Sequence, residues 1–339
     1  MKKRITYALA IAAALAVMFL VLESVSRSAD EHKGKTPIRV QLQWSPQAQF
    51  IGFYVAKLKG FYEAQKLDVT LLPGGFNTPP INSVISGNAD IGSATGDQVL
   101  LSRYNKLPIK AVGVVFPRSI AGFMSRTNLN IRAPADFRGK KIGYYAGFDT
   151  ENLIHGLLRK YGLDAQSDVS LTAVASLQAF ISATVDLFPV YEINEPLMMH
   201  RQGIGVNVLM PDNFGVEYYS DTLFTTEQFL GRNRAAVQRF LDATAQGWDY
   251  ARSNPDEALA IFVAAEPGIG ASDEGKAHQR AMLGKTLEII RKGTRRDVFR
   301  MDLDRWENMC QSLSDIGKLN NAPGDLVKSL CDPKVISDE

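Results

Sequence analysis

Residues 38–72, IRVQLQWSPQAQFIGFYVAKLKGFYEAQKLDVTLL, contain a strand pattern, a helix pattern and a second strand pattern in that order. Ile38–Leu42 alternates apolar and polar residues with the period of two that a half-buried strand requires. From Ile51 to Leu58, apolar residues recur at i, i+3, i+4 and i+7, which is the period of a helix, and Gly60 ends it. Asp68–Leu72 again has the composition of a strand. This order of patterns predicts an α/β fold.

The same alternation of strands and helices continues along the chain. A proline and glycine turn at 73–75 leads into a short helix through Ser86, and Pro117-Arg118 and Gly122 then interrupt the pattern. A last stretch, from about Thr222 to Asp315, is mostly helical. Further strands are predicted at 89–92, 109–116, 141–145, 169–174, 187–190 and 206–209, and helices at 98–104, 151–161 and from residue 194 onward.

The N-terminus has the pattern of an export signal. Met1-Lys2-Lys3-Arg4 is followed by 18 uncharged and mainly apolar residues, Ile5 to Leu22. Signal peptides carry about 7–15 apolar residues and a membrane-spanning helix needs about 20. Residues 1–28 are therefore predicted to be either a cleaved signal peptide or a retained anchor in the inner membrane. Both alternatives place the rest of the chain outside the cytoplasm, as in the periplasm.

The balance of charge argues against a nucleic-acid partner. The chain of 339 residues carries 38 basic and 36 acidic residues, for a net charge of +2. Cleavage after Ser28 would remove four basic residues and one acidic residue and leave a net charge of −1. Nucleic-acid binders need a concentrated basic face, whereas the charges alternate along this sequence. The length is sufficient for two domains, and we expect a monomer.

Residue patterns that carry catalysis or bind metals and cofactors are missing from the sequence. It has no G-x-G-x-x-G, Walker or G-x-S-x-G motif. Cys310 and Cys331 lack Cys-x-x-Cys spacing and a nearby histidine, so a zinc site is not expected. In an oxidising compartment these two cysteines could form a disulfide, or both could remain thiols. We therefore predict neither a metal nor a cofactor.

Aromatic, amide and acidic side chains repeatedly follow the predicted strands. The carboxyl ends of strands in α/β sheets are where ligands bind. Such positions in this chain are Trp44, Phe76-Asn77, Thr95-Gly96-Asp97, Phe148-Asp149 and Tyr191-Glu192. Their number indicates a cleft that binds a ring-shaped ligand.

Several segments of the chain resemble one known family. They are Leu42–Pro46, Gly52–Ala56, Lys59–Tyr62, Leu67–Val69, Ile85–Gly92, Asp136–Gly143 and Tyr219–Thr225. Together they resemble the substrate-binding proteins of ABC importers, in the branch that covers thiamine-precursor pyrimidines, nitrate, sulfonates and taurine. The resemblance extends over roughly residues 37–255, and its specificity lies in the combination of segments.

The resemblance implies the type II periplasmic-binding-protein fold, an α/β fold whose two lobes are joined by two hinge strands and close on a ligand. Lobe one would comprise residues 37–118 and 222–315, lobe two residues 119–221, with a helical C-terminal extension and a tail at 316–339. The chain would cross between lobes near Phe116–Gly122 and Tyr218–Thr222. The implied partners are a small-molecule ligand and a permease with a cytoplasmic ATPase, although presentation to a membrane sensor would need the same lobes. The candidate ligand contacts are Trp44, Phe76, Asn77, Thr95, Asp97, Phe148, Asp149, Thr150, Tyr191, Glu192, Tyr219 and Asp221.

Acidic residues at two helix starts favour a neutral or cationic ligand. Sites for nitrate and sulfonates need bare helix N-termini or basic residues. This chain instead places Asp149 and Glu151 at one helix start. Glu192 and Glu195 lie near another. The pyrimidine binders of the resembling branch carry an aromatic residue and a glutamate at the place of Tyr191-Glu192, and a carboxylate there can accept hydrogen bonds from an aminopyrimidine. A thiamine-precursor pyrimidine is the preferred ligand, with flavin-like compounds, amines, sulfonates and nitrate as alternatives.

The same branch includes fungal enzymes that build the thiamine pyrimidine from a histidine and a bound pyridoxal cofactor. In those enzymes a lysine follows the Asp-x-Gly strand, a histidine lies four residues further on, and a cysteine-rich run precedes the returning strand. The corresponding positions here hold Ala94, Gln98 and Glu217–Ser220. Because the amine, the imidazole and the thiols are replaced, the sequence favours a binding protein over an enzyme.

Overall fold

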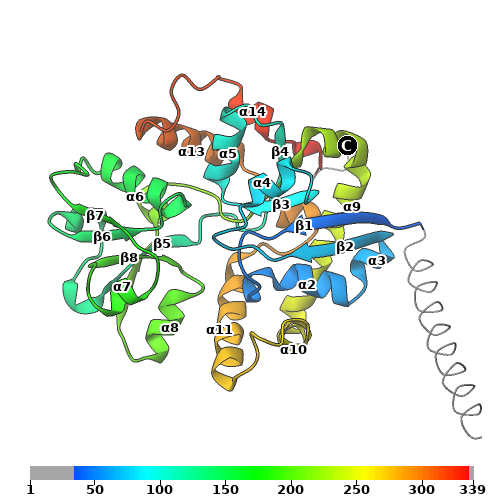
Figure 1. Ribbon diagram of the computed structural model, residues 1–339, viewed down its shortest axis with the longest axis horizontal. Helices are drawn as coiled ribbons and strands as arrows, with labels where there is room; N and C mark the ends of the chain where they lie inside the picture. The colour runs from blue at the N-terminus through cyan, green and yellow to red at the C-terminus, as the bar shows by residue number, and fades with distance from the viewer. Residues whose placement is uncertain (1–33, 336–339) are drawn as a thin grey trace, which may run out of the picture.

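Two five-stranded mixed sheets, each flanked by helices, form the protein (Figure 1). The computed structural model describes residues 34–335, so the predicted export signal lies outside the described residues. The strand order is β2-β1-β3-β10-β4 in the first sheet and β7-β6-β8-β5-β9 in the second. We call the first sheet and its helices lobe one, and the second sheet and its helices lobe two. The predicted α/β class is confirmed.

The sheet of lobe one has one antiparallel strand, β10, inserted between the parallel strands β3 and β4. β1 pairs in parallel with β2 and β3, whereas β10 pairs antiparallel with β3 and β4. Its strands are β1 (Thr36–Gln41), β2 (Leu67–Leu72), β3 (Ile91–Ala94), β4 (Ile109–Val114) and β10 (Thr222–Thr226). Its helices are η1 (Ala48–Phe50), α2 (Ile51–Leu58), α3 (Phe61–Ala64), α4 (Pro80–Ile85), α5 (Gly96–Tyr104) and α9 (Glu227–Ser253).

Lobe two repeats this plan with a different chain order. β6 pairs in parallel with β7 and β8, and β5 pairs antiparallel with β8 and β9. Its strands are β5 (Ala121–Arg126), β6 (Lys141–Tyr144), β7 (Ser170–Ala173), β8 (Leu187–Tyr191) and β9 (Val206–Leu209). Its helices are η2 (Thr127–Leu129), η3 (Pro134–Phe137), α6 (Asp149–Lys160), α7 (Gln178–Ile181), α8 (Glu195–Arg201) and η4 (Pro211–Phe214).

The chain enters lobe two after β4 and returns to lobe one before β10, so two segments connect the sheets. They lie side by side, because the Val115 N–H donates to the Asp221 carbonyl at 2.9 Å. The Ile120 N–H donates to the Ser220 hydroxyl at 3.1 Å. Two hydrogen-bonded crossings have the arrangement of a hinge. The boundaries predicted for the lobes and the tail stay predictions.

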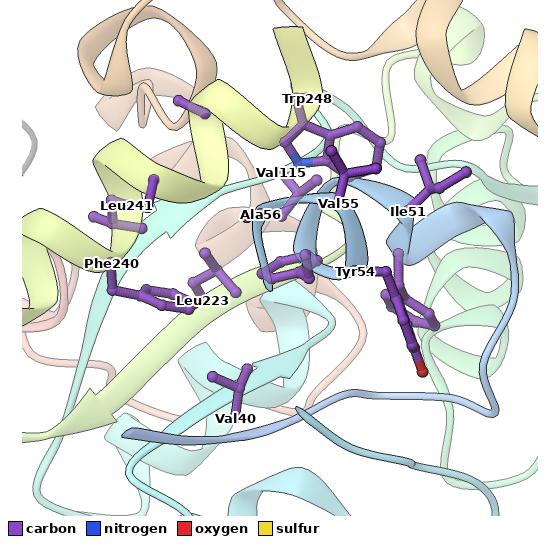
Figure 2. Packing of buried hydrophobic residues seen from close by; sticks show 14 of the residues in the cluster. Val40, Ile51, Tyr54, Val55, Ala56, Val115, Leu223, Phe240, Leu241 and Trp248 are labelled. Atoms are coloured by element: carbon purple, nitrogen blue, oxygen red, sulfur yellow. The ribbon is translucent and has the colours of Figure 1, made fainter. Parts of the chain in front are cut away.

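Close packing of α2 on α9 forms the centre of the lobe-one core. Gly52 on α2 lies against the indole of Trp248, and a Cβ at residue 52 would come within 2.3 Å of that ring. Figure 2 shows Trp248 of α9 next to Val55 of α2, with Phe240 and Leu241 at another part of α9. Only glycine permits this approach of helix to ring.

Strand β5 corrects one sequence prediction, because Gly122 was expected to interrupt the pattern and instead lies inside a central strand. Ala121–Ser125 is buried throughout, so the segment shows no apolar–polar alternation. A Cβ at Gly122 would lie 2.6 Å from the Leu209 carbonyl oxygen. The glycine therefore allows β9 to approach closely.

The C-terminal helices of the described chain border both lobes. α11 contacts α8 of lobe two, and α13 packs against both α5 and α6 (Figure 1). One continuous apolar cluster includes Leu157 of α6, Val99 of α5 and Leu313 of α13. The remaining elements are α10 (Pro255–Ala265), α11 (Asp273–Ile289), α12 (Arg295–Val298), α13 (Leu303–Asp315), α14 (Leu326–Leu330) and η5 (Pro333–Val335). Within residues 34–335 no helix is long and apolar enough to span a membrane.

The two cysteines are free thiols, so the disulfide that the sequence left open is not formed. Cys331 follows α14 and is buried beside Ala111 of β4, where the two residues form an isolated β-bridge. Burial raises the pKa of the Cys331 thiol to about 12. Cys310 lies half-buried on α13. The packing of α14 on β4 thus holds Cys331 without a covalent link.

Candidate functional site

A cleft lies between the lobes, at the carboxyl ends of β1, β6 and β8. Lobe one contributes residues from the loops that follow β1 and β2, and lobe two contributes the starts of α6 and α8. Among the described residues, the side chains that line it include no lysine or arginine. The lining consists of Trp44, Gln47, Phe76, Tyr145, Phe148, Asp149, Thr150, Val190, Tyr191, Asn194 and Glu195.

Four aromatic rings from both lobes meet at the cleft. The Trp44 and Phe76 ring centroids are 4.6 Å apart, and Phe76 lies 5.3 Å from Phe148. Tyr145 is 6.1 Å from Phe76. All of these contacts are edge-to-face, and Phe76 remains 54% exposed although it is a large apolar side chain. Rings presented at different angles by two lobes can enclose a planar ligand. We call Trp44, Phe76, Tyr145 and Phe148 the aromatic cage.

Asp149 lies beside the aromatic cage, and one of its carboxyl oxygens has no hydrogen-bond partner. It is the first residue of α6, follows Phe148 directly and is only 2% exposed. Its Oδ2 atom is buried and has no hydrogen-bond partner. Burial first, and then the charge of Asp97, hold the pKa of Asp149 well above its ordinary value. A buried carboxyl oxygen without a partner is costly, so this atom is available to a ligand that donates a hydrogen bond.

Two further carboxyl groups are fully buried near Asp149. Asp97 accepts hydrogen bonds from the Thr95 hydroxyl at 2.6 Å and from the Asn152 amide at 2.7 Å. Asp221 accepts from the Gln49 amide at 2.8 and 2.9 Å, and burial raises its pKa to about 7. Neither side chain lines the cleft, but the charges of both act on Asp149. The electrostatic environment of the cleft is therefore acidic.

Glu195 is the second carboxyl group of the lining, and it is linked through Asn194 to helix α11. It accepts hydrogen bonds from the Tyr191 N–H and the Asn194 amide, both at 2.8 Å. Burial raises its pKa to about 7. The Asn194 Oδ1 atom also lies 2.7 Å from Nε2 of His278 on α11. A chain of polar contacts thus runs from α11 to a carboxyl group in the cleft.

Most of the predicted ligand contacts lie in or beside this cleft. Thr95 lines a groove that adjoins it, and Asp97 and Asp221 lie close behind its wall. Their role as ligand contacts stays a prediction. Those that line the cleft itself are Trp44, Phe76, Phe148, Asp149, Thr150 and Tyr191.

Glu192 does not enter the cleft, which corrects its proposed role. It forms a two-fold ion pair with Arg118, with contacts of 2.5 and 3.1 Å, and its N–H donates to the Ile120 carbonyl. Successive side chains of an extended segment point to opposite sides. Because Tyr191 lines the cleft, Glu192 is directed to the hinge instead.

Tyr219 and Asn77 also lie elsewhere. Tyr219 is fully buried, and its hydroxyl accepts a hydrogen bond from the Asp302 N–H at 2.9 Å. Its ring packs on Trp306 at 5.3 Å between centroids, so it belongs to the core. Asn77 is exposed in the tight turn between Gly75 and Thr78.

Sequence reasoning missed some residues of the lining. Tyr145 and Val190 were assigned only to strands, although each lies at the carboxyl end where ligands bind. Glu195 was noted as a helix-start charge, and its position four residues after Tyr191 was the available signal. Gln47 and Asn194 carried no signal that separates them from other loop amides.

Comparison with known proteins places the chain in a family. The model of the family described as NMT1/THI5 like matches residues 47–258, which is more than half of the chain. The chain belongs to the NMT1/THI5-like family. The chain is similar to curated relatives of two kinds, binding proteins and synthases.

The chain is 28% identical to the riboflavin-binding protein RibY of Chloroflexus aurantiacus over 66% of this chain and 65% of that protein. It is 26% identical to the formylaminopyrimidine-binding protein of Halalkalibacterium halodurans, over 74% of this chain and 76% of the other. It is also 23% identical to 4-amino-5-hydroxymethyl-2-methylpyrimidine phosphate synthase of Candida albicans, over 70% and 74% of the two chains. This NMT1/THI5-like chain is thus similar to binding proteins and to synthases.

Solved structures show the fold of this NMT1/THI5-like protein. The alkanesulfonate-binding protein SsuA of Xanthomonas axonopodis, bound to MOPS, matches with a TM-score of 0.65 at 15% identity, over 88% of this chain and 98% of the other. A Candida albicans protein described as having the generic periplasmic binding protein fold matches with a TM-score of 0.60 at 16% identity, over 88% and 96%. The predicted periplasmic-binding-protein fold is confirmed.

Proposed function

We propose that this protein is the extracytoplasmic solute-binding component of an ABC importer, and that it captures a neutral or cationic nitrogen heterocycle of the pyrimidine type between its lobes. The observation that carries the proposal is the buried, unpaired Oδ2 atom of Asp149 beside the aromatic cage. An exocyclic amine or a ring N–H would satisfy that oxygen. The rings of Trp44 and Phe148 would contact the faces and edges of the heterocycle.

The charge of the site supports a ligand without negative charge. Asp149 and Glu195 line the cleft, and Asp97 and Asp221 lie behind it. Among the described residues that line the cleft, no lysine or arginine would offset the charge of an anion. Arg118 is also not available for this, because it is paired with Glu192. The uncompensated burial of an anion beside carboxyl groups is unfavourable.

The relatives support the same class of ligand. The names of two curated relatives, riboflavin-binding protein and formylaminopyrimidine-binding protein, both specify nitrogen heterocycles. The synthase relatives support an alternative enzymatic role. We favour binding because Ala94 and Gln98 occupy the positions where the resemblance predicts the synthase lysine and histidine. Two lobes joined by two crossings have the arrangement in which solute-binding proteins close on a ligand.

The first experiment identifies the ligand directly, by mass spectrometry of small molecules released from gently purified protein. We expect a nitrogen heterocycle without a phosphate or sulfonate group. The second measures the affinity for 4-amino-2-methylpyrimidine by isothermal titration calorimetry. We expect Asp149→Asn to weaken binding at least tenfold, equivalent to about 1.4 kcal/mol.

Controls separate the site from the fold. Glu288→Gln changes an exposed glutamate on α11 and should leave the affinity unchanged. Asp149→Asn keeps the size of the side chain and replaces a carboxyl group whose charged form burial disfavours, so its melting temperature should not fall below that of the wild type. Recovery of an anion as the retained ligand, or wild-type affinity in Asp149→Asn, would disprove the proposal.

A further inference from the structure

Helix α11 lies outside both sheets, yet it is fixed on lobe one at several points. The Ala48 N–H of η1 donates to Oε1 of Gln279 on α11 at 2.7 Å. Where α11 ends, Arg252 of α9 donates to the Ile290 carbonyl at 2.8 Å. A basic side chain in this place satisfies a carbonyl that the end of a helix leaves without a partner. Met282 of α11 is fully buried in the core cluster of lobe one. Helix α11 is therefore expected to move together with lobe one.

The same helix also contacts α8 of lobe two (Figure 1). At the start of α8, Oδ1 of Asn194 lies 2.7 Å from Nε2 of His278. At the end of α8, Arg201 donates to the Glu274 carbonyl at 3.3 Å, and the two side chains form an ion pair at 3.7 Å. Ile193, just before α8, is fully buried in the core cluster of lobe one. Both ends of α8 are thus joined to α11.

The hydrogen bonds of Asn194 determine which ring nitrogen of His278 carries the proton. Nδ2 of Asn194 donates to Oε1 of Glu195 at 2.8 Å, because a charged carboxylate can only accept. The amide oxygen of Asn194 therefore faces His278, and Nε2 must donate to it. Burial, and then the charge of Arg201, lower the pKa of His278, which favours the neutral ring. Nδ1 is buried without a partner in the described part of the chain, so His278 acts on its surroundings through the Nε2 proton.

These contacts hold the Glu195 carboxyl group from two sides. Its Oε2 atom accepts from the Tyr191 N–H within lobe two, and its Oε1 atom accepts from Asn194. Asn194 and Glu195 line the cleft, whereas His278 is not among the lining residues. Without the His278 N–H, the Asn194 amide would be free to rotate. Oε1 of Glu195 would then lose its fixed donor, and the cleft would present another arrangement of donors and acceptors.

We propose that His278 is a positioning residue of the ligand site, which orients Asn194 and, through Asn194, the Glu195 carboxyl group. This inference rests on the proposed function, because it concerns the cleft in which the ligand would bind. Since α11 is fixed on lobe one and α8 belongs to lobe two, the three side chains are aligned only while the lobes lie together. A ligand that contacts Asn194 or Glu195 therefore binds the closed arrangement more tightly than an open one.

Isothermal titration calorimetry with 4-amino-2-methylpyrimidine tests the positioning role. His278→Leu retains an apolar side chain of similar size and removes the N–H. It should weaken binding about fivefold or more, as the loss of one hydrogen bond does. His278→Gln offers an amide N–H in place of Nε2 and should restore the affinity to within about twofold of the wild type. His200→Leu replaces an exposed histidine of α8 and is the matched control, with unchanged affinity.

A double-mutant cycle tests the contact without any ligand. Urea denaturation gives the free energy of unfolding of the wild type, His278→Leu, Asn194→Ala and the double variant. If the two side chains are paired, the double variant loses less stability than the sum of the two single losses. His278 is only half-buried, so the variants should fold, which melting temperatures would check.

The outcomes separate this inference from the proposed function. Additive losses in urea would overturn the inference, because His278 and Asn194 would then not be paired. Wild-type affinity in His278→Leu, or no recovery in His278→Gln, would also overturn it and would leave the proposed function standing. If the probe does not bind the wild type, the pyrimidine assignment is wrong, whereas coupling in the urea cycle would still support the link from α11 to Glu195.

Discussion

Replacement of Glu195 by glutamine should flatten the pH dependence of folding stability. In the folded protein the pKa of Glu195 is raised by burial from its ordinary value of 4.5 to about 7. Between these two pH values the unfolded chain has released the proton and the folded chain still holds it. Stability therefore falls as the pH rises through this window, and the whole cost is present above pH 7.

The size of this effect follows from the difference between the two pKa values. At about 1.4 kcal/mol per pKa unit, the difference corresponds to at most about 3 kcal/mol. Part of Glu195 borders the open cleft, so solvent reduces the cost of its charge. We expect about 2 kcal/mol, most of it lost between pH 5 and pH 8.

Urea denaturation of the ligand-free protein at pH 5 and pH 8 measures this loss. Asp221, whose pKa is also raised to about 7, contributes in the same direction. His278, whose pKa burial lowers, contributes in the opposite direction. The informative quantity is therefore the loss in the wild type minus the loss in Glu195→Gln, with the exposed Glu288→Gln as the control that should behave like the wild type.

A result in which Glu195→Gln loses as much stability as the wild type between pH 5 and pH 8 would refute the reasoning. It would mean that Glu195 is solvated in the folded protein and that its carboxylate carries no burial cost. An increase of the loss in the variant would equally contradict the assigned sign.

Three further predictions test the site and the core. Trp44 lies in the cleft whereas Trp248 and the third tryptophan are fully buried, so Trp44→Phe should abolish any ligand-induced change in intrinsic fluorescence. Glu192→Gln should weaken ligand binding less than threefold, because Glu192 pairs with Arg118 at the hinge; a tenfold loss in calorimetry would return it to the site. Gly52→Ala should lower the free energy of unfolding by about 1–3 kcal/mol, because its methyl group would overlap the Trp248 ring; a urea midpoint equal to that of the wild type would contradict this packing.

Local periodicity predicted the regular elements with small errors at their ends. The strand expected at 206–209 is β9, and the helix expected at 151–161 is α6, which begins two residues earlier at Asp149. Strand β5 escaped prediction because it is buried on both faces and contains a glycine. A strand without alternation has no period-two signal, and the need for Gly122 arises only when β9 packs against it.

The sequence by itself determined the α/β class, the order of strands and helices, and the aromatic and acidic residues that follow strands. These features are local, since they depend on neighbours within a few residues along the chain. Only the tertiary structure decided which carboxyl groups enter the cleft. Arg118 pairs with Glu192 although the two are 74 residues apart, and this pairing leaves Asp149 and Glu195 to line the cleft. Because such a pairing depends on how the two crossings lie in space, no pattern within either segment could reveal it.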